Sequence, residues 1–372
     1  MIKQFSYNAS AVDAEAINII EGSLALARQT YEAAKEADYD AKNLVLCNAM
    51  AKFAIADTKF ATRIAGLSEE EQGEAARKLF SESMVRNNPV VRSNFEIILA
   101  QVVNAIIPEV NNEIFSRYIA EIHQVGFGDT AVFKIESNDL FAVKEIAEGV
   151  RDSVSQPMFD DEFTVNCHPV IIESHIDWYP FAAGRFDMGH YAVKVARSFA
   201  AYLFLKSING LTAATNLYGA AYQINGLAAN DWTELAEKVK AANGGMSVIA
   251  IGTKVALSNC VLNGNFQVEV GAEMQKVGFL DSFQGIPLIA IDNVLVPGTT
   301  NSTAQLALKN NRIWMIPVAG DKPVKIVFEG NQISVSENPE DTTDVRLGLK
   351  TSLRCGISAI VGSKLGTVKL SS

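Results

Sequence analysis

Hydrophobic residues recur at helical spacing through the first third of the chain. Ile17, Ile20, Leu24 and Ala27 follow one another at steps of three or four residues, the spacing of one face of an amphipathic helix. Ser68 is followed three residues later by a glutamate, a capping-box pattern that marks the start of a helix. The pattern predicts helices over residues 11–38, 41–65, 68–88, 90–107 and 111–123.

The hydrophobic period changes at Gly126. Residues 130–135 alternate apolar and polar side chains as a strand does, and a second extended run covers residues 162–173. The chain between these runs is charged and contains Pro157. Two strands joined by a long polar tip predict an extended hairpin over residues 130–173, with too few apolar residues to form a core of its own.

The rest of the sequence predicts one long helix followed by mixed helices and strands. The long helix covers residues 185–208, ends at Asn209 and Gly210, and carries an aromatic stripe around Phe199 that we interpret as core. A further helix is predicted over residues 231–242, and strands over residues 247–251, 287–296, 312–318 and 345–370. Residues 323–329 and 332–336 are predicted to pair through a tight turn. Together these elements predict an α+β fold.

Composition narrows the possible functions. The 372 residues include 32 basic and 42 acidic side chains, and the net charge of -10 argues against a protein whose main task is to grip nucleic acid. Four cysteines lie far apart without a CxxC pair, so we expect free thiols. The start of the chain lacks a signal-peptide pattern and no apolar run could span a bilayer. We therefore expect a soluble protein made in the cytoplasm, without a membrane partner.

The sequence contains no pattern that indicates catalysis or cofactor binding. Residues 126–131 match a loose GxGxxA, but the predicted order is helix then strand, the reverse of what dinucleotide binding requires. The four histidines lack metal-ligand spacing. Cys167 and His168 are neighbours on an extended segment, which prevents the convergence that a thiolate–imidazole pair needs. We expect a protein that is not an enzyme, without catalytic, cofactor-binding or metal-binding residues.

Six stretches of the chain stand out for their order, namely residues 125–135, 184–208, 246–257, 277–292, 312–317 and 344–348. In this order the chain resembles the Hong Kong 97-type fold of tailed-phage major capsid proteins. The first stretch resembles the entry to the family's extended loop (E-loop), and the second the spine helix of its peripheral (P) domain. The third and fourth resemble a passage of the axial (A) domain and the glycine-rich lead into its central strand. The last two resemble strands that return to the P domain.

The resemblance implies a division into domains. Residues 89–125, the spine helix at 176–212 and the strands at 319–350 belong to the P domain, residues 126–175 to the E-loop, residues 213–318 to the A domain, and residues 351–372 return to the A domain. Residues 1–88 depart from the family as an N-terminal helical arm or extension. Apolar residues lie on several faces of these helices, so they either pack on their own P domain or lie across a neighbouring subunit as a clamp. We favour the clamp.

The resemblance also implies a structural function. Copies self-assemble through hexameric and pentameric capsomers into the icosahedral shell of the virion, which encloses double-stranded DNA by non-specific contact only. It further implies a scaffolding protein, a portal protein and assembly in the cytoplasm of a bacterial host. We expect the hairpin to contact another subunit through Arg151, Phe159, Asp160, Asp161 and Glu162.

Two other interpretations stay open. An encapsulin-type shell protein shares the fold but encloses an enzyme cargo. From a different class, an α/β enzyme whose site no short motif reveals would contain a concave site with convergent polar groups.

Lys134 and Lys144 raise the question of a covalent cross-link between subunits, which also needs an acceptor asparagine and a catalytic acid on neighbours. We do not expect one.

Overall fold

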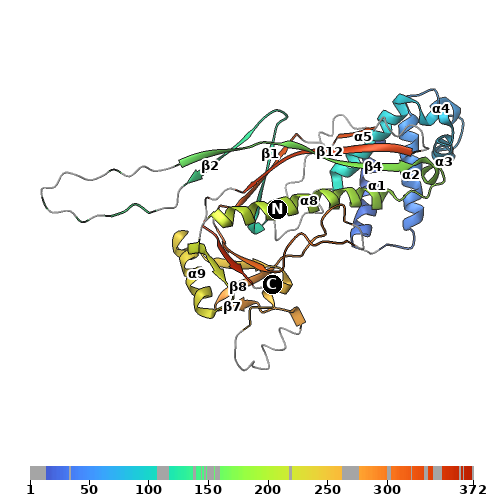
Figure 1. Cartoon of the computed structure of the whole chain (residues 1–372). Coiled ribbons are helices and arrows are strands. Elements are labelled where there is room, and N and C mark those ends of the chain that lie inside the picture. The colour runs from blue at the N-terminus through green and yellow to red at the C-terminus, as the bar shows by residue number, and fades with distance from the viewer. Residues whose placement is uncertain are drawn as a thin grey trace. The chain divides into compact units, whose positions relative to one another are not determined.

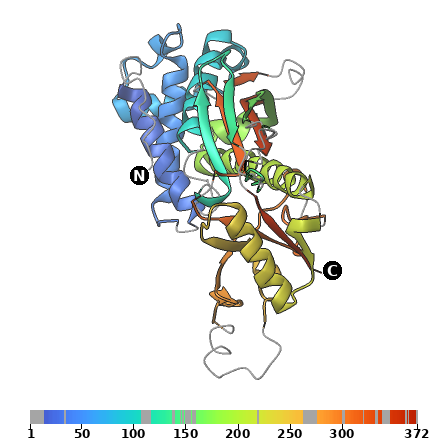
Figure 2. The ribbon, with the colours of Figure 1, turned by 90° about the vertical axis from the view of Figure 1, so that its left-hand side faces the viewer.

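The computed structural model describes residues 14–32, 35–106, 117–136, 140–143, 145, 148, 155, 160–217, 220–261, 276–299, 303–319, 321–330, 334–337, 346–359, 362 and 364–370. The chain divides into two compact units, whose elements can be followed in Figure 1 and Figure 2. Unit 1 comprises residues 1–111, 169–200 and 331–354, and unit 2 comprises residues 112–168, 201–330 and 355–372. Both units are therefore discontinuous in sequence.

Unit 1 is built mainly of the helices that precede residue 107. Its described elements are α1 (Ala14–Tyr31), α2 (Tyr39–Ile55), the 3-10 helix η1 (Ala61–Arg63), α3 (Glu69–Leu79), α4 (Ser83–Arg86), α5 (Pro89–Ile106), α7 (Trp178–Ala182), β11 (Ser334–Glu337) and large parts of β4 (His168–Asp177), α8 (Met188–Leu217) and β12 (Arg346–Ala359). Strand β12 pairs with β4 and, antiparallel, with β11. The predicted start of α3 is confirmed, because the Ser68 N–H donates to Glu71 Oε2 at 3.2 Å.

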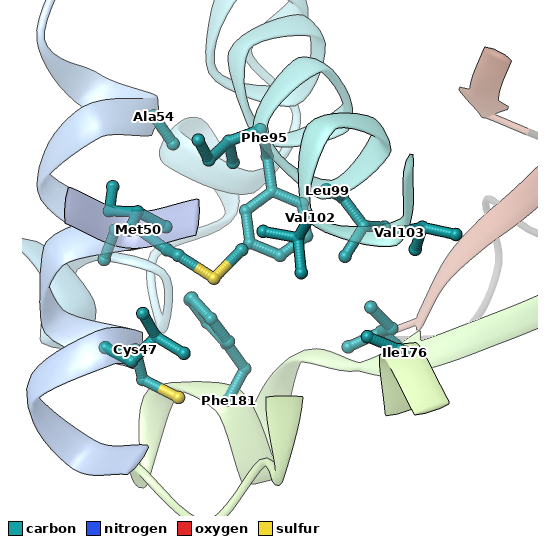
Figure 3. Packing of buried hydrophobic residues seen from close by; sticks show 14 of the residues in the cluster. Cys47, Met50, Ala54, Phe95, Leu99, Val102, Val103, Ile176 and Phe181 are labelled. Atoms are coloured by element: carbon teal, nitrogen blue, oxygen red, sulfur yellow. The ribbon is translucent and has the colours of Figure 1, made fainter. Parts of the chain in front are cut away.

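The core of unit 1 gathers α2, α5, α7 and α8. Figure 3 shows Met50 of α2 directed toward Phe95 of α5 and Phe181 of α7, and all three side chains are fully buried. Phe80 and Trp178 join Phe95 and Phe181 in an aromatic cluster with ring centroids 5.1–6.4 Å apart. Aromatic residues bury large apolar areas, and tilted or offset pairs add roughly 0.5–1.5 kcal/mol each. The cluster therefore joins residues from before and after the hairpin in one core.

This packing includes the described helices of residues 1–88. The described helices of this region place Ile19, Cys47 and Met50 in the same buried core as Val195 and Phe199 of α8. Side chains buried inside their own chain are not available to cover a neighbouring subunit. These side chains therefore pack within the chain's own body, and an inter-subunit clamp formed by the remaining, exposed side chains stays a prediction.

Polar contacts also fix the start of α8 to the N-terminal helices. The Tyr39 hydroxyl donates to Asp187 Oδ1 at 2.7 Å, and the same oxygen accepts the backbone N–H of His190 at 2.9 Å. Asp187 therefore caps α8 while it holds α2. Burial raises the pKa of Tyr39 to about 12, so this hydroxyl keeps its proton and remains a donor.

Unit 2 contains a six-stranded sheet, a smaller set of paired strands and a hairpin. Its described elements are β1 (Ala120–Val125), β2 (Ala131–Glu136), β3 (Asp160–Val165), the 3-10 helix η3 (Ala220–Tyr222), β5 (Gln223–Asn225), α9 (Ala229–Ala242), β6 (Val248–Gly252), α10 (Lys254–Leu257), β7 (Ser282–Phe283), β8 (Ile286–Ala290), β9 (Arg312–Pro317), β10 (Val324–Glu329), β13 (Gly366–Lys369) and the remaining parts of α8 and β12. The six-stranded sheet has the order β5-β13-β9-β6-β8-β7. Helix α9 packs on it through Trp232, which meets Phe283 edge to face. Beside it, β10 pairs parallel with β1 and antiparallel with β12.

Helix α8 is longer than the sequence predicts. It runs on to Leu217, and Asn209 and Gly210 lie inside it. Ile208, Leu211 and Ala214 continue its buried face past the glycine. Burial of that face outweighs the cost of an interior glycine, about 1 kcal/mol relative to alanine. Within the described ranges, no helix combines the length and apolar character needed to cross a membrane.

Other predictions need correction, although the α+β class is confirmed. Strands β10 and β11 do not pair with each other, because each pairs with β12. The extended run over residues 162–173 is two strands, of which β3 pairs with β2 and β4 pairs with β12. Residues 120–125 form strand β1 rather than part of a helix. In each case a partner distant in sequence decides the structure, and local propensity carries no information about that partner.

Candidate assembly surface

The hairpin of β2 and β3 belongs to neither of the larger sets of strands. Its register runs from Ala131↔Val165 to Glu136↔Asp160. Neither strand pairs with any third strand among the described residues. The outer edges therefore present backbone N–H and C=O groups that no described strand pairs. Such edges are the surfaces through which strands and segments of another chain add to a protein.

Large apolar side chains beside these edges are exposed. Leu140 and Val143 are each 95% exposed, and Phe141 between them is 57% exposed. On the strands, Val132 and Phe163 are also exposed. Exposed apolar groups that follow one another along the chain mark a surface that another protein surface covers, because their burial gains about 25 cal/mol per Å². We call Leu140, Phe141 and Val143 the hairpin patch; Val132 and Phe163 lie on opposite faces of the two strands.

Acidic residues gather at the end of the hairpin that adjoins residues 137–159. Glu136 is the register partner of Asp160, and Lys134 is the partner of Glu162.

The structure describes three of the five residues that were predicted to contact another subunit. Asp160, Asp161 and Glu162 lie on β3, and Glu162 is exposed. Arg151 and Phe159 lie outside the described residues. Sequence reasoning missed the hairpin patch, although an apolar run at residues 140–143 inside a polar segment was a signal that could have revealed it.

The start of the hairpin rests on one face of β1 and β10. Glu121 and Lys325 are register partners, as are His123 and Val327, and spacings of two place these four side chains on one face. The Phe133 ring of β2 lies on this face, 4.8 Å from the His123 ring and 5.5 Å from Lys325 Nζ. Four residues beyond Lys325, Glu329 Oε1 accepts the backbone N–H of Gly128 at 2.9 Å. We call these contacts the hairpin root.

The cationic group at the centre of the hairpin root is shielded from water, whereas its carboxylate partners are partly exposed. The Lys325 side chain is only 4% exposed, and its ammonium donates to the carboxylates of Glu121 and Asp321. His123 Nε2 lies 2.8 Å from the other Glu121 oxygen, Oε1. Burial by itself would raise the pKa of Glu121, but the Lys325 ammonium and His123 outweigh it and hold that pKa below its usual value.

The segment that leads from β3 to β4 is also closely packed. Val165, the last residue of β3, is buried. A Cβ at Gly356 of β12 would lie 2.6 Å from the carbonyl oxygen of Asn166, so only glycine allows the chain to pass here. Cys167 Sγ lies 3.7 Å from the carbonyl oxygen of Val327 in β10. Both strands of the hairpin therefore join the rest of unit 2 through fixed, short connections.

Groups that could serve chemistry are dispersed. His168 and His175 are both exposed on β4. Burial raises the pKa of the Cys47, Cys260 and Cys355 thiols to about 12, which keeps them protonated. In the part of the chain that the structure describes, no three His, Cys, Asp or Glu side chains converge in a way that could hold a metal ion.

Comparison with known proteins gives matches in structure only. No family model matches the sequence, and no curated protein matches it. The mature capsid of bacteriophage PhiM1 shares 10% identity over 69% of this chain and 87% of the capsid chain, with a TM-score of 0.48. A phage-related protein from Bordetella bronchiseptica shares 11% identity over 72% of this chain and 96% of its own, with a TM-score of 0.45. A virus-like particle protein from Pyrococcus furiosus shares 10% identity over 74% of this chain and 99% of its own, with a TM-score of 0.41.

The chain is similar in fold to phage capsid proteins. Its described elements follow the order that the sequence resemblance implies, with N-terminal helices, a hairpin, the long helix α8 and the six-stranded sheet with α9.

Proposed function

We propose that this chain is a structural, self-assembling protein, the major capsid (head) protein of a tailed phage. Copies form hexameric and pentameric capsomers, and the capsomers form the icosahedral shell that encloses double-stranded DNA in the virion. A scaffolding protein and a portal protein are the further partners proposed, and the shell assembles in the cytoplasm of the bacterial host.

One observation carries this proposal. The hairpin exposes two strand edges that no described strand pairs, together with the apolar side chains of Leu140, Phe141 and Val143. Monomeric proteins in water usually cover such edges and carry polar residues at such positions. A second copy of the chain covers this surface in a shell, where every subunit offers the same hairpin to its neighbour. Contacts between different surfaces of identical copies generate closed rings when the rotation between copies permits closure.

The net charge of the chain agrees with a container for DNA. With 42 acidic and 32 basic residues the protein carries a charge of -10. Phosphate binding requires clustered lysine and arginine, and each neutralised phosphate adds affinity. A shell of acidic subunits encloses DNA without binding it tightly. Weak binding allows the DNA to enter and leave the shell.

The experiment that tests this function alters the hairpin patch. The variant Leu140→Ser, Phe141→Ser, Val143→Ser removes apolar side chains that are 57–95% exposed in the subunit, so we expect a folded, soluble subunit that does not assemble. Light scattering and electron microscopy report assembly, and circular dichroism reports folding. A control, Val45→Ser with Met84→Ser, removes two side chains that are each 66% exposed on unit 1. Normal shells from the hairpin variant would rule out this role for the patch.

A further inference from the structure

The hairpin is attached to its unit by side chains rather than by a β-ladder. Strands β2 and β3 pair with each other, and neither shares a ladder with β1, β10 or β12 in the described chain. Backbone ladders fix the direction of a strand through many hydrogen bonds. Here the direction depends on the contacts of the hairpin root, among them the side chains that β1 and β10 present to Phe133, and on the close packing of residues 165–167.

Lys325 occupies the centre of the hairpin root. Its ammonium is nearly buried, donates to Glu121 of β1 and to Asp321 of the preceding loop, and lies 5.5 Å from the centre of the Phe133 ring. A cation held near an aromatic ring is attracted more strongly when water is excluded. An ammonium removed from water in turn requires its carboxylate partners, because an unpaired buried charge is very unfavourable. Lys325 is therefore restrained from two sides, and its position defines where Phe133 rests.

We propose that Lys325 is a positioning residue for assembly, which fixes the direction in which the hairpin leaves β1 and β10. The hydrogen bond that the Gly128 backbone N–H donates to the Glu329 carboxylate holds the connection between β1 and β2 on β10, four residues beyond Lys325. Phe133 faces Phe163 across the hairpin, so a restraint on β2 passes to β3 through their ladder. The consequence for assembly rests on the proposed function. The anchoring itself is a property of the single subunit.

Hydrogen exchange measured by mass spectrometry on the purified full-length chain tests the anchor. In Lys325→Met the side chain keeps its length but loses its charge, and we expect exchange of the β2 and β3 amides to accelerate about tenfold or more, with β6 and β9 unchanged. Lys325→Arg keeps the positive charge and should retain most of the protection. The matched control is Lys254→Met, which removes an exposed lysine of α10 whose ammonium lies 3.9 Å from Asp292.

A second variant covers the case in which Lys325→Met fails to fold. The double variant Glu121→Gln, Asp321→Asn removes both negative charges and keeps the shapes of the two side chains. Lys325 and Phe133 themselves are not substituted. This variant should accelerate exchange in β2 and β3 selectively. Uniform acceleration across β6 and β9 as well, or unchanged exchange in β2 and β3 for both variants, would overturn the proposal. Because exchange is read on the unassembled chain, a negative result here leaves the capsid function standing, and failure of the chain to assemble leaves the anchor standing.

Discussion

The ring of Phe80 stacks on the ring of Trp178, with centroids 5.1 Å apart and planes inclined by 27°. Phe80 follows α3 in the N-terminal helical region, and Trp178 begins α7, nearly a hundred residues later. This contact makes the N-terminal helices part of the subunit's core rather than an appendage. It also leads to two predictions about stability.

The first prediction concerns Phe80 itself. Phe80→Ala leaves a cavity among Phe95, Trp178 and Phe181, and such a change costs about 3–5 kcal/mol of unfolding free energy. Denaturant titration followed by tryptophan fluorescence measures this cost. Met84→Ala, a change at a side chain that is 66% exposed, serves as the control and should shift the unfolding free energy by less than about 0.5 kcal/mol.

The second prediction concerns removal of the region. A chain that begins at Asn87 lacks α1, α2 and α3, and it exposes the faces of Phe95 and Phe181 that those helices cover. We expect this truncated chain to be insoluble or to unfold without cooperativity, as seen by solubility and calorimetry. A truncated chain that is soluble and melts at the temperature of the full chain would show that the N-terminal helices are dispensable for folding.

The third prediction concerns α8. Phe199 is 1% exposed, so Phe199→Asp places a carboxylate in an apolar core without a partner, at a cost on the order of several kcal/mol. We expect a large fall in melting temperature or loss of soluble protein. Ala213→Asp, at an exposed position on the same helix, should change the melting temperature little. An unchanged melting temperature for Phe199→Asp would contradict the register assigned to α8.

The fourth prediction concerns acid. The pKa of Glu121 in the folded chain lies below its ordinary value of 4.5. A lowered pKa means that ionised Glu121 stabilises the hairpin root above about pH 4.5, and that this stabilisation is lost as the pH falls through the folded-state pKa. The titratable groups near Lys325 are Glu121 and His123 on β1 and Asp321 in the adjoining loop. The Phe133 ring of β2 also lies near the ammonium, and Ser358 of β12 is the register partner of Lys325.

Hydrogen exchange as a function of pH measures this dependence. After correction for the intrinsic exchange rate, protection of the β2 and β3 amides should fall below about pH 4.5, with protection of β6 retained to lower pH. In Glu121→Gln the acid dependence should be weaker, because one of the titrating groups is gone. A hairpin whose protection is independent of pH down to the global unfolding transition would contradict the assigned electrostatics.

Local patterns in the sequence predict much of the fold and little of its pairing. The helical period around Ile17 and Ile20, the capping box at Ser68 and Glu71, and the strand at residues 247–251 all correspond to observed elements. Helix propensity and the alternation of apolar and polar residues are local properties of the sequence. The positions of helices and strands, and the faces that they bury, follow from these properties. The pairing of β10 and β11 with β12 depends on residues after 345, and no local signal indicates it.

The candidate site was predictable only in outline. An extended hairpin follows from the sequence, although β3 begins two residues earlier, at Asp160, than the predicted strand; the contact predicted through Glu162, which is exposed, stays a prediction. The hairpin root did not follow, because the pairing of Lys325 with Glu121 spans about two hundred residues and requires the parallel register of β1 and β10. A lone lysine in an apolar strand gives no indication of which acids it meets.

Electron microscopy of the purified full-length chain tests the central claim most directly. If the chain is a capsid protein, it forms closed hollow shells or regular tubes, built of repeated ring-shaped units, under conditions that favour association. Shells produced in bacteria with a portal and packaging machinery should contain DNA rather than protein cargo. A population that remains as monomers or small discrete oligomers at high concentration, with and without a scaffolding protein, would contradict the account.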